Sequence, residues 1–220
     1  NGTKKLLDYA RTNEIQSVLL ASSLEVYGTI TNDSKPLTED AQGFLNPMDV
    51  RSSYPMAKRA AETLCHNYAK EYGTHTKVAR LAQTFGAGVT KDDNRVFAQF
   101  ARSIINGEDI IMHTKGELCR CYCYTTDAIA AMLYILLRGK DSEAYNVANE
   151  TTYISIKDMA TFLAETFNPK VKVVVELKEN MGYSPTTKLR LSTNKIQQLG
   201  WTPHYNLQEM FHRLIESLKQ

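Results

Sequence analysis

The chain has 220 residues, a formal net charge of +2 and 43% hydrophobic residues, with acidic and basic side chains interspersed. These values predict a globular protein with a substantial core, and they argue against the basic surface stripe that nucleic-acid binding needs. No apolar run reaches the roughly 18 residues of a membrane-spanning helix, and the N-terminus lacks the layout of a signal peptide. We therefore expect a cytoplasmic protein with neither nucleic acid nor membrane among its partners.

The first part of the chain is expected to begin with a helix over residues 2–10, followed by a buried strand over 15–21. Ser22 and Ser23 lie at the C-terminal end of that strand. A polar loop runs from there to Asn46-Pro47, and it is long enough to suspect a function.

A well-defined helix is predicted next. Ser53 can act as its N-cap, Pro55 lies in its first turn, and Gly73 marks its end, while apolar residues recur at helical spacing between them.

Strands and helices continue to alternate to the C-terminus, which predicts an α/β fold. Strands are expected at residues 77–85, 110–113, 119–124, 145–148 and 171–177, and helices at 95–106, 126–137, 155–167 and 206–218, the last capped by Asn206.

Three of the four cysteines, Cys119, Cys121 and Cys123, fall on one predicted strand, where alternate residues share a face. Zinc sites usually need a second pair of ligands, and neither Cys65 nor the scattered histidines provide one. The sequence therefore favours buried thiols, and no metal site is expected.

Tyr54 and Lys58 are one helical turn apart, so both project from the same face of the predicted helix. A free phenol, with a pKa near about 10, is a weak base at neutral pH, and a nearby cation favours the phenolate. Tyr153 and Lys157 have the same spacing, but no hydroxyl-bearing strand end precedes them, so we interpret this second match as chance. Tyr54 differs because Ser22 and Ser23 lie upstream at a strand end, where α/β sheets assemble their sites.

Six motifs follow one another in order along the chain, namely Ser22-Ser-Leu-Glu-Val-Tyr-Gly28, Tyr54-Pro-Met-Ala-Lys58, Arg80-Leu-Ala-Gln-Thr-Phe-Gly86, Arg120-Cys-Tyr-Cys-Tyr-Thr-Thr-Asp127, Tyr145-Asn-Val147 and Leu199-Gly-Trp201. In this order they resemble the extended short-chain dehydrogenase/reductase family of NAD-dependent nucleotide-sugar epimerases, dehydratases and decarboxylases. The resemblance implies a Rossmann-like parallel sheet and a smaller C-terminal substrate-binding subdomain. Residues 1–90 would be the C-terminal part of the dinucleotide-binding domain. Residues 91–220 would mainly bind substrate, with 119–148 partly returning to the Rossmann sheet.

The resemblance also implies roles for the residues at the strand end and on the helix. Tyr54 would be the catalytic base that takes a proton from a sugar hydroxyl, and Lys58 would bind the nicotinamide ribose. Ser23 would hydrogen-bond the reacting oxygen, and Ser22 and Tyr54 would also contact the cofactor, NAD or NADP.

A nucleoside diphosphate sugar is the implied ligand. Arg120 matches the arginine that clamps the diphosphate, a role that suits its planar donor fork. Gln83 stands where the family often has Asn, and Lys188 and Arg190 are further candidates for substrate binding.

The residues after Ser23 bear on the reaction. Family dehydratases carry Asp-Glu there and the decarboxylases Ser-Glu, whereas this chain has Leu24-Glu25. Leucine cannot donate a proton, while Glu25 could act as a base near the sugar's C5. The sequence favours an epimerase-like reaction that oxidises C4 transiently. A 4,6-dehydratase, a UDP-glucuronate decarboxylase and a non-catalytic nucleotide-sugar-binding module are the alternatives.

The family's opening strand and glycine-rich pyrophosphate-binding turn have no match in the sequence. We expect the 220 residues to be a fragment that is inactive by itself and binds NAD weakly. The helix over residues 53–72 and the preceding one are expected to form a homodimer interface, as in family members.

Overall fold

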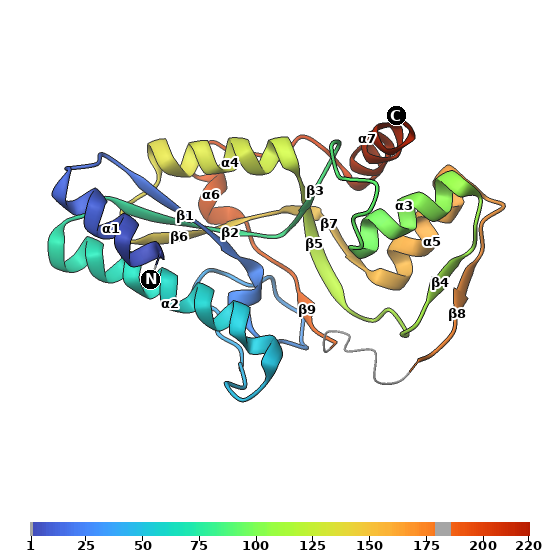
Figure 1. The fold of residues 1–220 in the computed structure, drawn as a ribbon, viewed down its shortest axis with the longest axis horizontal. Coiled ribbons are helices and arrows are strands. Elements are labelled where there is room, and N and C mark those ends of the chain that lie inside the picture. Colours follow the sequence, from blue (N-terminus) through green and yellow to red (C-terminus); the bar gives the residue numbers. More distant parts are fainter. Residues whose placement is uncertain (1, 179–185) are drawn as a thin grey trace.

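The computed structural model describes residues 2–178 and 186–220. Two larger sheets lie one after the other along the long axis of the molecule (Figure 1), and a third sheet is a parallel pair of the strands Ile110–Met112 and Val173–Val175. The first is a parallel sheet in the order β1-β2-β6. Its strands are β1 (Val18–Ser23), β2 (Thr76–Leu81) and β6 (Glu143–Val147).

Helices cover both faces of this sheet. Figure 1 shows α1 (Gly2–Thr12) and α2 (Ser53–Tyr72) on one face and α4 (Thr125–Arg138) on the other. The first face buries Leu7, Cys65, Tyr68 and Val78 together, and α4 buries Ala128, Ala131 and Ile135 against the sheet. The α/β class and the parallel sheet predicted from the sequence are confirmed.

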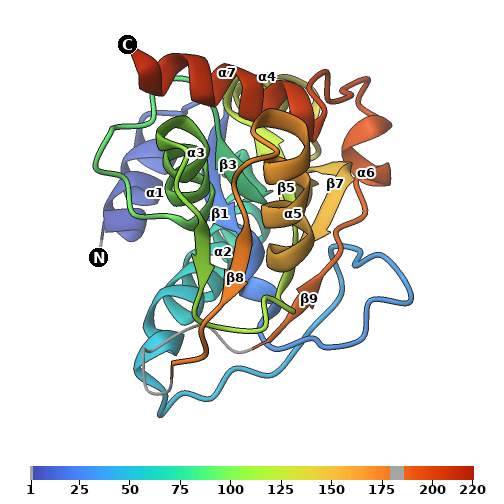
Figure 2. The same ribbon diagram turned by 90° about the vertical axis from the view of Figure 1, so that its right-hand side faces the viewer.

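The second part of the molecule is built on a mixed sheet in the order β3-β5-β7, with β9 also paired to β5. Figure 2 shows α3 and α5 side by side over this part, with α7 lying across them. Their apolar sides form a core with aromatic stacking of Phe85 on Phe97 at 4.4 Å between ring centroids. The elements are β3 (Gln83–Phe85), β4 (Ile110–Met112), β5 (Cys119–Tyr124), β7 (Asn149–Ser155), β8 (Val173–Val175), β9 (Lys188–Leu189), α3 (Val96–Asn106), α5 (Ile156–Phe167), α6 (Asn194–Gln197) and α7 (Leu207–Lys219).

At two points where the chain passes from the parallel sheet to the mixed sheet, a single residue separates the strands. Ala82 joins β2 to β3, and Ala148 joins β6 to β7. Both alanines are buried, and the Ala82 amide donates to the carbonyl oxygen of Val147 at 2.9 Å. The two sheets therefore meet at a tight, buried junction.

This junction corrects one prediction. The apolar run at 77–85 was expected to be one strand, but it divides at Ala82 into β2 and β3, which pair in different sheets. The division of the chain into two domains stays a prediction. In the structure, β5 lies in the second sheet, whereas α4 and β6 pack with the first.

The end of α2 agrees with the prediction, because Gly73 adopts the left-handed conformation at φ +69° and its amide bonds back to the helix. Its start differs by one residue. Ser52 is the N-cap, Ser53 is the first helical residue, and no side-chain cap bond forms. At α7 the predicted cap is confirmed as a capping box between Asn206 and Glu209.

The predicted thiol burial is confirmed for Cys65, Cys121 and Cys123, while Cys119 is half-buried; all four are unpaired. Among the residues that the structure describes, no group of three potential metal ligands comes together. In the same residues, no helix has the length and apolar character needed to cross a membrane.

Candidate active site

The C-terminal end of β1 leads into a short 3-10 helix, η1 (Leu24–Tyr27). Ser23 caps it, since its hydroxyl oxygen accepts from the Glu25 amide at 3.2 Å. Gly28 ends it at φ +69°, where a Cβ atom would lie 2.6 Å from the Phe44 carbonyl oxygen. Only glycine fits that turn. The turn directs Glu25 away from the buried Leu24 and Val26.

Tyr54 and Lys58 lie in the first two turns of α2, as the spacing predicts. The Lys58 ammonium lies 5.7 Å from the centroid of the Tyr54 ring and donates to the carbonyl oxygen of Ala21 at 2.7 Å. Tyr54 is 52% exposed. The structure thus brings the phenol, the ammonium and the β1 strand end with Ser23 into one neighbourhood.

The second Tyr/Lys match behaves differently. Tyr153 belongs to strand β7, and Lys157 belongs to helix α5. The Tyr153 hydroxyl donates to the Asp33 carboxylate at 2.8 Å. The two residues therefore do not share a helical face, in agreement with the interpretation of this match as chance.

A cleft of about 620 Å³ lies between the two parts of the molecule, and Glu25, Gln83 and Arg120 line it. Arg120 is only 4% exposed. Its Nη1 donates to the carbonyl oxygens of Cys119 and Thr187 at 3.0 and 3.1 Å, and its Nη2 lies 3.9 Å from the Glu25 carboxylate.

Burial lowers the pKa of Arg120, and Glu25 only partly offsets this effect. A buried guanidinium that lies beyond hydrogen-bond distance of the Glu25 carboxylate favours an anionic ligand. Arg120 therefore has an environment suited to an anion-binding residue, and its role in binding a diphosphate stays a prediction.

Lys188 and Arg190 are not among the residues that line this cleft. The Lys188 ammonium lies 3.5 Å from the Asp33 carboxylate, and the Arg190 guanidinium lies 6.0 Å from the centroid of the Tyr153 ring. Both cations thus engage groups outside the cleft, and their predicted role in substrate binding finds no support in this geometry.

Sequence reasoning missed other polar residues of the cleft wall. Arg95 at the start of α3 is held by the Asp93 carboxylate at 2.6 Å. The dense charges of residues 91–95, directly after the Gly86-Ala-Gly88 turn, were the available signal. Further polar lining residues include Arg51, Asn94, Gln99, His113 and Lys115.

A second hollow, about 840 Å³, runs along α7. None of the residues predicted to be functional lines it, and it is lined by α7 side chains together with Ala87 and Asn206. The cleft with Arg120 is therefore the better candidate.

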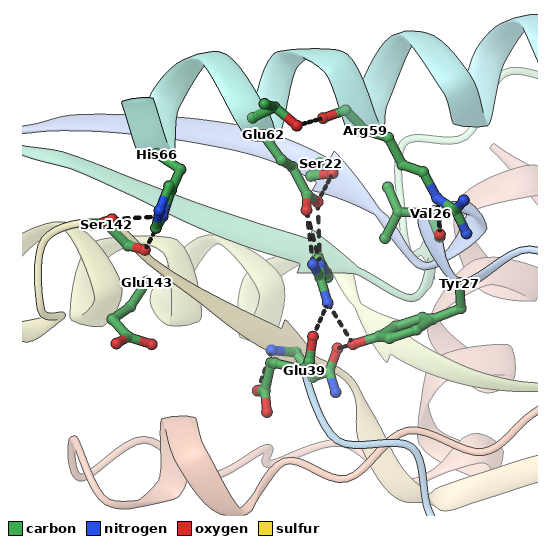
Figure 3. A network of polar contacts seen from close by, with 12 residues as sticks. Ser22, Val26, Tyr27, Glu39, Arg59, Glu62, His66, Ser142 and Glu143 are labelled. Atoms are coloured by element: carbon green, nitrogen blue, oxygen red, sulfur yellow. Dashed lines mark hydrogen bonds and ion pairs between the residues drawn. The ribbon is translucent and has the colours of Figure 1, made fainter. Parts of the chain in front are cut away.

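Ser22 was predicted to contact the cofactor, and that contact stays a prediction. In the structure the Ser22 hydroxyl donates to the Glu62 carboxylate at 2.5 Å, and the residue is 4% exposed (Figure 3). Glu62 comes from α2, one turn after Lys58.

Comparison with known proteins gives this arrangement a family. Residues 1–148 match the model of the NAD dependent epimerase/dehydratase family. The chain belongs to that family.

Relatives of this epimerase/dehydratase family member include UDP-glucuronic acid decarboxylase 5 of Arabidopsis thaliana, which is 30% identical over 94% of the chain and 59% of its own length. UDP-glucuronic acid decarboxylase 1 of Xenopus tropicalis is 29% identical over 100% of the chain and 50% of its own length. The chain thus spans between half and three fifths of these relatives.

Solved structures share the fold of this family member. The UDP-glucose 4-epimerase of Thermotoga maritima superposes with a TM-score of 0.82 at 23% identity, over 99% of the chain and 68% of the epimerase. The dTDP-glucose 4,6-dehydratase of Bacillus anthracis gives 0.81 at 16% identity, over 99% of the chain and 66% of the dehydratase. These identities support the fold alone, and the Rossmann-like architecture predicted from the sequence is confirmed.

Proposed function

We propose that this protein oxidises C4 of a nucleoside diphosphate sugar transiently, using a nicotinamide cofactor. The observation that carries the proposal is the placement of Lys58 on the Ala21 carbonyl oxygen, beside Tyr54 and the β1 strand end with Ser23. The cleft with Arg120 adjoins this strand end through Glu25. Such a grouping at the carboxyl ends of parallel strands is where α/β sheets bind their ligands.

The donors present fit a nicotinamide ribose. The Lys58 ammonium has three N–H donors, and only one is needed for the Ala21 carbonyl. The remaining donors, with the half-exposed Tyr54 hydroxyl, would hold a ribose hydroxyl. A bound nicotinamide would supply the acceptor for the hydride that leaves C4. NAD rather than NADP is favoured by the family's description.

The chain's own residues would move the proton. Tyr54 would take it from the C4 hydroxyl, because a phenolate is the only strong base that this turn of α2 can offer. The Lys58 ammonium would stabilise that phenolate electrostatically. Ser23 would hydrogen-bond the same oxygen while its own oxygen accepts from the Glu25 amide.

Substrate binding would rest on Arg120 and Gln83. The buried guanidinium would pair with the diphosphate, and the Gln83 amide would add a neutral donor in the same cleft. Arg95, preoriented by Asp93, is a further candidate for the anionic part of the ligand.

Decarboxylation of UDP-glucuronate is the second candidate for the step that follows C4 oxidation. The Arabidopsis and Xenopus relatives described above carry UDP-glucuronic acid decarboxylase names. The position of the Glu25 carboxylate next to the Arg120 guanidinium also supports decarboxylation. The carboxylate of the sugar could replace that of Glu25 beside this guanidinium. Leu24 is buried in a hydrophobic cluster, which leaves no acid at that position for a 4,6-dehydratase. The epimerase-like reaction favoured by the sequence stays a prediction.

A product assay with the whole protein tests the proposal. UDP-glucose, UDP-glucuronate and dTDP-glucose are incubated with it and NAD, and products are identified by NMR. A C4 epimer would support epimerisation, and a UDP-pentose with released CO₂ would support decarboxylation. A 4-keto-6-deoxy product would contradict the interpretation of Leu24. If the protein binds the sugar without turning it over, and Tyr54→Phe binds the sugar equally well, the result would favour a non-catalytic binding module.

We also propose a homodimer through α1 and α2. Leu6 and Tyr9 on α1, with Tyr72 on α2, are exposed large apolar side chains on the outer side of the first sheet. Light scattering of wild type and Leu6→Glu tests it, since a charge there should shift a dimer toward monomer. A mass of one chain for the wild type would contradict it. The cytoplasmic location stays a prediction.

A further inference from the structure

A buried polar network lies between α2 and the carboxyl end of the first sheet (Figure 3). Its centre is the Glu62 carboxylate, which accepts from the Ser22 hydroxyl at 2.5 Å. It also accepts from Arg80 on β2, at 2.8 Å from Nη2 and at 3.1 and 3.2 Å from Nε. The Glu62 and Arg80 side chains are only 12% and 14% exposed.

The network continues from Arg80 to the opposite side. Its Nη1 donates to the Tyr27 hydroxyl at 3.1 Å and to the Glu39 carbonyl oxygen. The Tyr27 hydroxyl donates in turn to the Asn146 side chain at 2.6 Å. One set of contacts therefore joins α2 to β1, β2, β6, η1 and the loop that follows η1.

Ala21 and Ser22, which are neighbours on β1, each form a hydrogen bond with a residue of α2. The Ala21 carbonyl accepts from Lys58, and the Ser22 hydroxyl donates to Glu62, one helical turn further along. These two contacts fix both the position of α2 along the strand and its rotation. The Lys58 ammonium can reach the Ala21 carbonyl oxygen only while α2 keeps this register with β1.

Stability alone does not explain a buried ion pair here. Well-packed apolar side chains of similar volume would often be as stable, because desolvation offsets much of the attraction between buried charges. What a bidentate guanidinium–carboxylate contact adds is a defined geometry, since its two parallel hydrogen bonds allow little sliding.

We propose that Ser22, Glu62 and Arg80 are positioning residues that hold the Tyr54/Lys58 face of α2 in register with the β1 strand end. The proposal concerns where Lys58 lies, and its meaning for catalysis rests on the function proposed above. It also gives the Ser22 hydroxyl a role that requires no contact with a ligand.

Chemical labelling of lysines tests the register without cofactor or substrate. The 220-residue chain is treated briefly with an acetylating reagent, and the rate at each lysine is read by peptide mass spectrometry. The variants are Glu62→Ala, Ser22→Ala and Ser22→Thr, which keeps the hydroxyl. Glu143→Ala is the matched control, because it breaks the ion pair between Glu143 on β6 and Lys195 on α6 and leaves the Ser22–Glu62–Arg80 contacts in place.

In Glu62→Ala the Lys58 rate should rise about fivefold relative to Lys157, because local opening of α2 frees the ammonium. Ser22→Ala should raise it by a smaller factor, and Ser22→Thr should restore the wild-type ratio. An unchanged ratio in Ser22→Ala and Glu62→Ala, or an equal rise in Glu143→Ala, would overturn the proposal. If Glu62→Ala does not fold, the comparison of Ser22→Ala with Ser22→Thr still decides.

Kinetics of the active enzyme provide the second measurement. Misplaced Lys58 should lower kcat in Ser22→Ala about tenfold while KM for the sugar stays within about twofold, because Arg120 and Gln83 bind on the other side of the cleft. Ser22→Thr should recover kcat. A changed Lys58 labelling ratio in a protein whose wild type shows no turnover would support the positioning role and count against the proposed function.

Discussion

Glu25 and Arg120 face each other at 3.9 Å, the first from η1 at the end of the parallel sheet and the second from β5 of the mixed sheet. The cleft therefore exists only where the two parts of the molecule pack together.

Arg120→Ala should weaken binding of UDP by about tenfold to a hundredfold, because charge-assisted hydrogen bonds contribute about 1.5–3 kcal/mol. Arg190→Ala is the control, since Arg190 does not line the cleft and should leave the affinity unchanged. Calorimetric titration of each variant with UDP measures both. Equal losses in the two variants would contradict the assignment of Arg120.

Tyr54→Phe should lower turnover about 10²- to 10⁴-fold, the usual contribution of a positioned base. Because Tyr54 is 52% exposed, the free energy of unfolding should change by less than about 0.5 kcal/mol. Tyr72→Phe on the same helix should keep full activity. Steady-state kinetics of the whole enzyme and urea unfolding of both variants provide the test, and a fully active Tyr54→Phe would remove Tyr54 from the mechanism.

Asp33 should contribute to the loss of stability in acid. The Tyr153 hydroxyl, and more weakly Lys188, hold the pKa of its carboxyl below the ordinary 3.8. The group therefore stabilises the fold above the unfolded pKa, and this contribution is lost as the pH falls through the lower folded value. Urea unfolding between about pH 3 and pH 5 should show a shallower acid loss in Asp33→Asn than in the wild type. Tyr153→Phe should also make the free energy of unfolding fall less steeply over this pH range. An unchanged pH dependence in both variants would contradict this account.

The cysteines should differ in reactivity. Burial raises the pKa of Cys65 and of Cys121 to about 11 and that of Cys123 to about 12. Because the thiolate is the nucleophile, a thiol reagent at pH 8 should modify half-buried Cys119 first and the other three only on unfolding. The raised values also mean that stability falls as the pH rises above the ordinary thiol pKa of 9.0, since the unfolded chain loses those protons first. Mass spectrometry of the modified chain checks the order, and early modification of Cys123 would contradict it.

The helices were predictable because their signals are local. Gly73 ends α2 through its own backbone conformation, and the Asn206 box starts α7 through bonds within four residues. The spacing of Tyr54 and Lys58 on one face follows from helix geometry in the same way.

Strand pairing was less predictable. The polar residues of β7 give no alternating pattern, and the strand forms because β5 pairs with it across the sheet. The break at Ala82 has no marker either, since an alanine in an apolar run is compatible with a continuous strand. Only the tertiary partners of β2 and β3 separate them.

The site shows the same limit. Residue type identifies a cation, but the direction of its side chain depends on partners far away in sequence. The Lys188 ammonium pairs with the Asp33 carboxylate. Arg120 is oriented toward the cleft by its hydrogen bonds to the backbone oxygens of Cys119 and Thr187. One signal was available in the sequence. Arg80 interrupts the apolar run of β2, and Glu62 lies one turn after Lys58 on α2, which together indicate a buried ion pair.

The junction at Ala82 and Ala148 bears on how the molecule moves. Hinges need residues that can absorb large backbone changes. Ala82 and Ala148 are both buried, and a large backbone change at Ala82 would break the hydrogen bond from its amide to the Val147 carbonyl oxygen. The two sheets should therefore rotate as one rigid body. Ligand entry would then depend on side chains and on the loop between Gly28 and Asp49, and X-ray scattering profiles with and without UDP should superimpose.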